Sequence, residues 1–183
     1  MPVRQWDKQV MPAKSQTRLT FVLGGARSGK SVFAEKIVTE FAPPWHYIAT
    51  AHGYDDEMTA RISTHKARRS EGWVTHEAPL ELARVLGVMQ AGQPVLVDCL
   101  TLWLTNTMLA GRPVETAIGT LMDVLAALPG PCVVVSNEVG LGIVPDNALA
   151  RAFKDHAGRL HQRVAAMADR VVFMVAGLPM EVK

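Results

Sequence analysis

The chain has 183 residues, of which 49% are hydrophobic and 20% charged, and its formal net charge is +2. This length suffices for one substantial core and is too short for two large independent domains. A near-neutral charge does not favour a general nucleic-acid binder, and no apolar run approaches the ~20 residues of a membrane span.

The first residues, MPVRQWDKQVMPAKSQT, lack the continuous apolar stretch of a secretory signal, and we expect a flexible extension over residues 1–17. A single nucleotide-binding domain over 18–183 is expected to follow it. Cys99 and Cys132 lie in apolar, strand-like segments and have neither metal-site spacing nor the density of a disulfide framework. We interpret them as reduced core residues of a cytoplasmic protein.

The first predicted strand, LTFVL from Leu19, leads into the stretch GGARSGKS. This stretch matches the phosphate-binding pattern G-x-x-x-x-G-K-[ST], and a helix predicted over 31–41 follows it. Glycines there let backbone N–H groups wrap a phosphate at the positive end of the helix dipole. Lys30 would reach the β- and γ-phosphates, and the Ser31 hydroxyl would bind Mg²⁺. The predicted nucleotide-binding residues are Gly24, Gly25, Ala26, Arg27, Ser28, Gly29, Lys30 and Ser31; the alternative is a glycine-rich turn that matches by chance.

The second predicted strand, WHYIAT from Trp45, is followed by a segment unusually dense in titratable groups, AHGYDDEMTARISTHKARRSEGWVTHEAP. Thr50, Ala51 and His52 end that strand, and doubly wound sheets bind ligands at the carboxyl ends of their strands. A helix is predicted from Asp55 or Asp56 to about residue 69. The segment therefore lies on the ligand side of the sheet.

On that helix, His65 stands beside a cationic group formed by Lys66, Arg68 and Arg69. A lone histidine at such a position is most often structural. Cations that bind phosphate also help to keep a neighbouring imidazole neutral, and a neutral imidazole near a nucleotide can attack phosphorus. The other interpretation of the charges is a solvated helix face or pairing with the helix C-terminus. His46 in a strand, His76 in a short extended piece, and His156 and His161 on a long helix with ample surface are weaker candidates.

The third predicted strand, PVLVDCL from Pro94, follows a helix predicted over 79–91 and carries Asp98 near its end. A Walker B carboxylate is expected at this place, where it would share Mg²⁺ with Ser31. The alternative role is the N-cap of the next helix, and both roles are compatible.

The remaining segments are helical over 100–129 with a break at AGRP, a strand PCVVVSN from Pro131, a helix over 145–169 and a strand RVVFMVAG from Arg170. Unbroken Val/Ile/Leu strands between helices are typical of a parallel sheet covered on both faces. We therefore predict an α/β fold of the P-loop NTPase type, with a RecA-like, mostly parallel sheet and helices on both faces. Such a fold leaves the acceptor undefined.

The quoted stretches, together with VLVDCLTLWLTN and SNEVGLGIVPDNALARAF, closely resemble one family over about residues 19–183. This is the bifunctional adenosylcobinamide kinase/adenosylcobinamide-phosphate guanylyltransferase family of adenosylcobalamin biosynthesis. The resemblance implies phosphorylation of adenosylcobinamide with ATP or GTP. It then implies transfer of GMP from GTP to that phosphate through a guanylylated His65, with release of pyrophosphate. It further implies a homotrimer with nucleotide sites near subunit boundaries.

By the same resemblance, a set of residues beyond the phosphate-binding loop would contact GTP: Thr50, Ala51, His52, Lys66, Ala67, Arg68, Arg69, Glu77 and Asp98. Glu138, after the fourth strand, would bind Mg²⁺, accept a proton or form a structural salt bridge. The turn at 140–145 offers an apolar surface suited to a bulky corrinoid, to which Trp103, Leu104 and Met108 add unless they pack in the core. Gly53 and Gly72 are candidate hinges of the segment that carries His65.

Two other functions fit the phosphate-binding loop. One is a P-loop small-molecule kinase without nucleotidyl transfer, and the other is a RecA-like regulatory module that needs no corrinoid.

Overall fold

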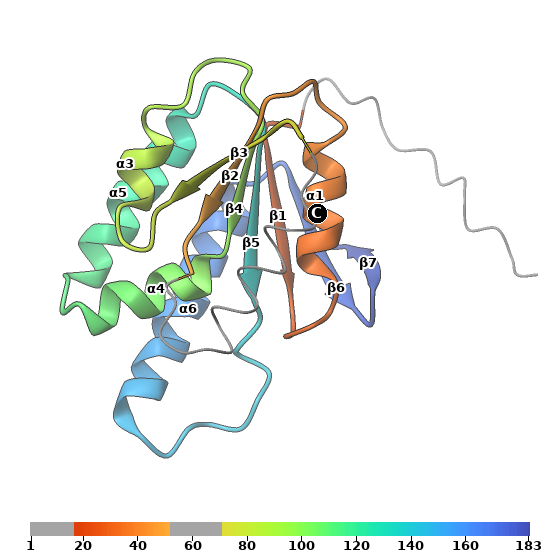
Figure 1. Cartoon of the computed structure of the whole chain (residues 1–183). Coiled ribbons are helices and arrows are strands. Elements are labelled where there is room, and N and C mark those ends of the chain that lie inside the picture. Colours follow the sequence, from red (N-terminus) through yellow and green to blue (C-terminus); the bar gives the residue numbers. More distant parts are fainter. Residues whose placement is uncertain (1–16, 52–70) are drawn as a thin grey trace, which may run out of the picture.

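The computed structural model describes residues 17–51 and 71–183. Its strands form one sheet of seven in the order β3-β2-β4-β5-β1-β6-β7 (Figure 1). All neighbouring pairs from β3 to β6 are parallel, and β7 runs antiparallel to β6. The strands are β1 (Leu19–Gly24), β2 (Trp45–Ala49), β3 (Trp73–Glu77), β4 (Val95–Asp98), β5 (Cys132–Asn137), β6 (Arg170–Val175) and β7 (Leu178–Glu181).

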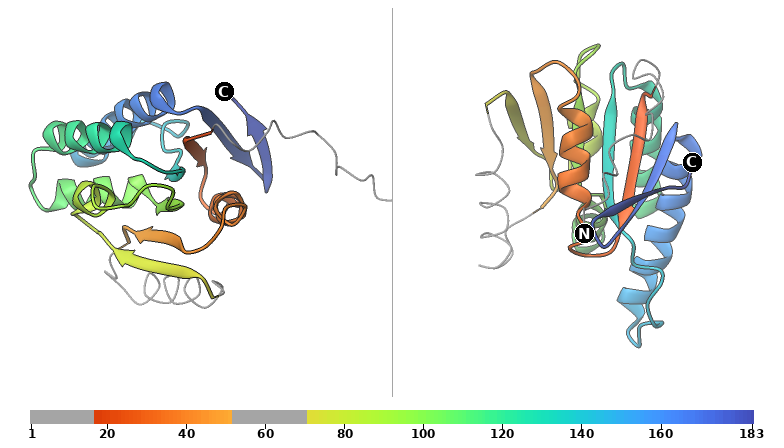
Figure 2. Two further views of the ribbon diagram at one scale, coloured as in Figure 1. Left: turned by 90° about the horizontal axis from the view of Figure 1, so that it is seen from above. Right: turned by 90° about the vertical axis from the view of Figure 1, so that its right-hand side faces the viewer.

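Helices cover both faces of this sheet, as predicted. Helix α1 lies against one face, and the other helices of the described ranges lie against the opposite face (Figure 2). They are α1 (Lys30–Val38), α3 (Leu82–Leu86), α4 (Leu100–Leu109), α5 (Val114–Ala127) and α6 (Ala148–Met167). The helix predicted from Asp55 or Asp56 lies outside the described residues. None of the described helices combines the length and apolar character that a membrane span needs.

The central strands bury both faces, so their sequences are continuous apolar runs. Along β5, Val134 joins the core under α4, α5 and α6, whereas Val133 and Val135 join the core under α1. The first core includes Trp103 and Leu104 of α4, with Met108 packed against it, so these side chains are core residues. Cys99 and Cys132 are free and buried, as predicted.

Two strands were not predicted as strands, and both lie at sheet edges. The sequence around His76 predicts only a short extended piece where β3 forms, and β7 contains Pro179 and exposes all four of its residues. An edge strand lacks the two-sided burial that makes a strand apolar, so composition gives little signal there.

Three helices are shorter than predicted. The helix expected over 31–41 spans Lys30–Val38. The helix expected over 79–91 spans Leu82–Leu86, and Gly87 caps it. The helix expected from Pro145 begins at Ala148, where the side chain of Asn147 accepts a hydrogen bond from the Ala150 N–H at 2.7 Å. A side-chain cap satisfies a backbone donor that has no partner within the helix, which fixes this start.

The parallel register brings the carboxyl ends of β1, β2, β3, β4 and β5 to the same end of the sheet. Gly24 stands opposite Asn137, and Ala49 stands between Glu77 and Asp98. Because parallel strands place all their carboxyl ends at the same edge, the loops after these strands share one side of the molecule.

Candidate nucleotide site

The loop over residues 24–31 joins β1 to α1, as the phosphate-binding pattern requires. A Cβ atom added at Gly24 would lie 2.6 Å from the Met174 carbonyl oxygen, so no side chain fits there. Gly29, the N-cap of α1, has a left-handed φ of 95°. That conformation favours glycine, and the N-terminus of the helix that begins here offers unpaired backbone N–H groups of the kind that bind phosphate.

Lys30 begins α1 and is buried, and its Nζ donates a hydrogen bond to the Gly25 carbonyl oxygen at 2.5 Å. Burial lowers the pKa of Lys30, while the neighbouring Cys99 and Asp98 oppose that shift. The loop therefore holds one cation at its centre, close to the end of β4.

Asp98 is the last residue of β4, and its Oδ2 accepts a hydrogen bond from the Tyr47 hydroxyl at 3.1 Å. Leu96, two residues earlier, packs in the core under α1, so the Asp98 side chain faces the same side of the sheet as Lys30. The N-cap of α4 is Cys99, so the alternative role of Asp98 as that cap is wrong.

The side chains at the end of β4 and at the start of α1 include oxygen donors that fit Mg²⁺. These donors are one carboxylate, on Asp98, and the hydroxyl of Ser31 in the first turn of α1. Magnesium is usually bound through one or two carboxylates, waters and substrate phosphates, and it needs no all-protein cage. Within residues 17–51 and 71–183, no group of three or more His, Cys, Asp or Glu could hold a metal ion.

The end of β2 is joined to β4 through Thr50, which is fully buried. The Thr50 hydroxyl donates to the Cys99 carbonyl at 2.6 Å and accepts from the Cys99 N–H at 2.7 Å. The Asn106 side chain donates to the carbonyls of Thr50 and Pro79, both at 2.9 Å. These bonds fix the edge of the sheet on which the site stands; the GTP contact implied for Thr50 stays a prediction.

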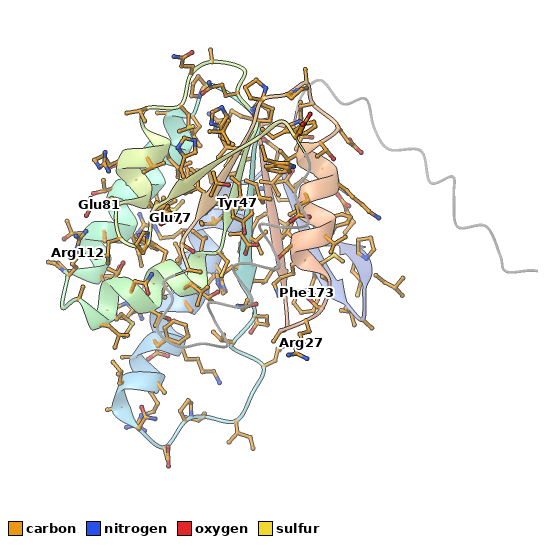
Figure 3. The ribbon with its side chains drawn as sticks, viewed as in Figure 1. Arg27, Tyr47, Glu77, Glu81, Arg112 and Phe173 are labelled. Atoms are coloured by element: carbon orange, nitrogen blue, oxygen red, sulfur yellow. The ribbon has the colours of Figure 1, made fainter. Side chains whose placement is uncertain are left out.

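Three further predicted residues lie at the same edge. Ala51 directly follows Thr50, and Glu77 ends β3 in register with Ala49 and Asp98. Arg27 is exposed on the phosphate-binding loop, where β1 ends, and Figure 3 labels it together with Glu77 and Tyr47. The predicted residues His52, His65, Lys66, Ala67, Arg68 and Arg69, with the hinge candidate Gly53, lie outside the described residues.

The other hinge candidate, Gly72, has a left-handed φ of 100°, and an added Cβ would lie 2.9 Å from the Trp45 ring. This glycine is required by a turn and a close contact. Its role as a hinge stays a prediction.

The end of β5 holds polar residues whose arrangement the sequence analysis largely missed. The Thr101 hydroxyl accepts from the backbone N–H and the side-chain amide of Asn137, at 3.2 and 3.1 Å. Glu138 donates its N–H to the Gly24 carbonyl at 2.9 Å, and its Oε1 accepts from the N–H groups of Gly140 and Leu141. Glu138 therefore connects the phosphate-binding loop to the segment after β5.

His161 was placed on a helix with ample surface, but its side chain is buried, and its Nε2 lies 2.8 Å from the Ser136 Oγ. Burial lowers the pKa of His161, and Glu138 opposes the shift. The signal was present in the sequence: His161 shares a helical face with Ala157, Leu160 and Val164, all of them buried.

A phosphate-binding loop between β1 and α1, a buried lysine at its centre and a carboxylate at the end of β4 define a P-loop nucleotide-binding protein with a RecA-like fold. Solved structures agree on the fold. A prototypical ATPase from the type III secretion system of pathogenic bacteria has a TM-score of 0.54 at 11% identity. The match covers 90% of this chain and 56% of the ATPase chain. A protein of Pyrococcus horikoshii OT3 has a TM-score of 0.50 at 10% identity and covers 91% and 86%.

The family model "Cobinamide kinase / cobinamide phosphate guanyltransferase" matches residues 20–182, and the chain belongs to this family. The bifunctional adenosylcobalamin biosynthesis protein CobP of Pseudomonas aeruginosa is 50% identical over 165 residues, covering 88% of this chain and 95% of that protein. The similarly named CobU of Salmonella typhimurium is 39% identical over 181 residues, covering 90% and 99%. The family, the enzyme class and the P-loop fold expected from the sequence are thus confirmed.

Proposed function

We propose that this protein phosphorylates adenosylcobinamide with ATP or GTP and then guanylylates the product through His65, using one nucleotide site for both reactions. The family match across residues 20–182 carries the proposal, because it includes the phosphate-binding loop, Asp98 and the segment with His65. The bifunctional names of the relatives support the pairing of the two reactions.

In the kinase step, the backbone N–H groups of the loop and the Lys30 cation hold the triphosphate and neutralise its charge. The hydroxyl oxygen of the aminopropanol arm forms a bond to the γ-phosphorus as the bond to the bridging oxygen breaks. The nucleoside diphosphate leaves, and the hydroxyl proton is released to water. The burial of Lys30 supports this role, because a charge in a dry site acts more strongly on a phosphate.

Mg²⁺, when bound, would neutralise phosphate charge, and Ser31 and Asp98 are the residues that would hold it. The Tyr47 hydroxyl bound to Asp98 Oδ2 would fix the orientation of that carboxylate. Tyr47 was not among the residues predicted for the site.

In the guanylyl step, a ring nitrogen of neutral His65 forms a bond to the α-phosphorus of GTP, and the bond to pyrophosphate breaks. A phosphate oxygen of adenosylcobinamide phosphate then attacks the same phosphorus. The phosphorus–nitrogen bond breaks, which frees His65 and gives adenosylcobinamide-GDP. Holding the triphosphate in the same loop would place the leaving pyrophosphate against Lys30.

The site that we propose extends over the residues predicted to contact GTP, with His52, Lys66, Ala67, Arg68 and Arg69 adding to Thr50, Ala51, Glu77 and Asp98. We also propose a cytoplasmic homotrimer, in which residues 18–183 form the catalytic domain and residues 1–17 take no part in catalysis. These proposals rest on the family resemblance.

Two labelled nucleotides test the function. With γ-labelled GTP and adenosylcobinamide, label should enter the corrinoid; with α-labelled GTP, label should enter first the protein and then the corrinoid. Transfer of γ-label alone would make the protein a kinase without nucleotidyl transfer. Transfer of neither label would favour a nucleotide-dependent regulatory module.

A further inference from the structure

The segment that follows β5 exposes large apolar side chains. We call residues 140–147 the apolar loop; within it Leu141, Ile143 and Val144 are 84%, 97% and 69% exposed. Leu149, in the first turn of α6, is also exposed. A cluster of exposed apolar side chains in one short segment is characteristic of a binding surface.

Side chains of α6 and of Glu138 form hydrogen bonds with the backbone of the apolar loop. The Lys154 Nζ donates to the Gly142 carbonyl at 2.9 Å, and the Arg151 Nη1 donates to the Pro145 and Asp146 carbonyls at 2.9 and 2.6 Å. At the other end, the Glu138 Oε1 accepts from the Leu141 N–H at 3.1 Å. These bonds restrain the backbone of the apolar loop, while the side chains of Leu141, Ile143 and Val144 stay exposed. A restrained backbone lowers the entropy cost of binding a ligand.

The position of the apolar loop relates it to the nucleotide site. It follows Glu138, whose N–H is bound to the Gly24 carbonyl at the start of the phosphate-binding loop. Ile143 lies five residues beyond Glu138, hence within about 18 Å of it, since an extended chain spans at most ~3.6 Å per residue. The loop and the first turns of α6 project beyond the edge where β5 ends (Figure 1).

These observations point to cobinamide, the acceptor of the phosphoryl group, as the ligand of the apolar loop. This inference rests on the proposed function. Cobinamide reacts through the end of one side arm, so its corrin ring must rest outside the phosphate-binding loop but within reach of that arm. The ring has broad faces rich in methyl groups, which gain free energy when they are buried against apolar side chains. We propose that the apolar loop forms part of the binding surface for the corrin ring, with Ile143 and Val144 as its principal contacts.

The test compares Ile143→Ser and Val144→Ser with the control Val88→Ser. Val88 is also 69% exposed, but it precedes β4. It therefore lies near the amino ends of the strands, whereas the apolar loop follows the carboxyl end of β5. In the kinase reaction, the KM for cobinamide should rise about tenfold in Ile143→Ser and severalfold in Val144→Ser, as expected for losing one buried aliphatic contact. The Kd for GTP measured without cobinamide, the thermal midpoint and all properties of Val88→Ser should match the wild type.

An unchanged KM for cobinamide in both loop variants would overturn the inference while leaving the proposed function intact. A change in sedimentation that accompanies the substitutions, with no change in KM, would also overturn it, because a second copy of the chain would then cover the loop. If the wild type itself fails to phosphorylate cobinamide, the proposed function falls, and the inference falls with it.

Discussion

The side-chain nitrogen of Lys30 lies 2.5 Å from the carbonyl oxygen of Gly25, five residues earlier in the chain. This bond spans the phosphate-binding loop and keeps a buried cation at its centre. The nearby carboxylate of Asp98 partly offsets the effect of burial on the pKa of Lys30. The loop thus holds a buried cation against its own backbone.

Replacing this lysine tests whether both reactions use one site. Lys30→Ala should weaken GTP binding about ten- to a hundredfold, since a hydrogen bond to a charged group contributes roughly 1.5–3 kcal/mol. Both transfer reactions should slow, because each needs the triphosphate held. Lys36→Ala, on the exposed side of α1, is the control and should bind GTP normally. A loss confined to one of the two reactions would contradict a shared site.

The close packing of Gly24 predicts different tolerance at two neighbouring glycines. Gly24→Ala should lower the free energy of unfolding by about 1–3 kcal/mol, because the new methyl group would lie 2.6 Å from the Met174 carbonyl oxygen and 2.8 Å from the Ser28 Oγ. A Cβ at Gly25 has no neighbour within 4 Å, so Gly25→Ala should unfold at nearly the wild-type denaturant concentration. Equal stability of the two variants in urea titration would show that the loop packs differently.

The pair of hydrogen bonds between Thr50 and Cys99 predicts a structural effect of a nearly isosteric change. Thr50→Val removes both bonds and leaves the buried Cys99 N–H without its partner, which should cost about 1–3 kcal/mol of unfolding free energy. Thr39→Val, at an exposed helix end, serves as the control and should change stability by less than about 0.5 kcal/mol. A Thr50 variant as stable as the wild type would mean that these bonds do not fix the edge of the sheet.

The burial of His161 predicts that the folded protein loses stability in acid. Its pKa in the folded protein lies below the ordinary value of 6.5, chiefly because burial disfavours the imidazolium. The unfolded chain therefore binds more protons as the pH falls, so this contribution is complete above pH 6.5 and declines below it. In urea titrations at several pH values, His161→Gln should show a shallower decline than the wild type. An identical decline would assign the acid sensitivity to other groups.

Much of the fold follows from the sequence because the central strands are buried on both faces and are therefore apolar throughout. The same reasoning missed β3 and β7, whose edge positions remove that signal. The phosphate-binding loop and Asp98 were predictable because local spacing determines them. The hydrogen bonds from Thr50 to Cys99 and from Asn106 to Pro79 join residues far apart in the chain, and a local sequence pattern cannot predict such contacts. The burial of His161 was readable from helical spacing, but a histidine on a polar helix suggested a surface position.

The central claim is that one site serves two transfers and that His65 carries the guanylyl group between them. Mass spectrometry of the intact protein after incubation with GTP and Mg²⁺, followed by peptide mapping, tests it most directly. We predict an adduct of one GMP per chain on His65, absent from His65→Ala, while that variant still phosphorylates adenosylcobinamide. Absence of an adduct from the wild type, or its location on another residue, would contradict the account.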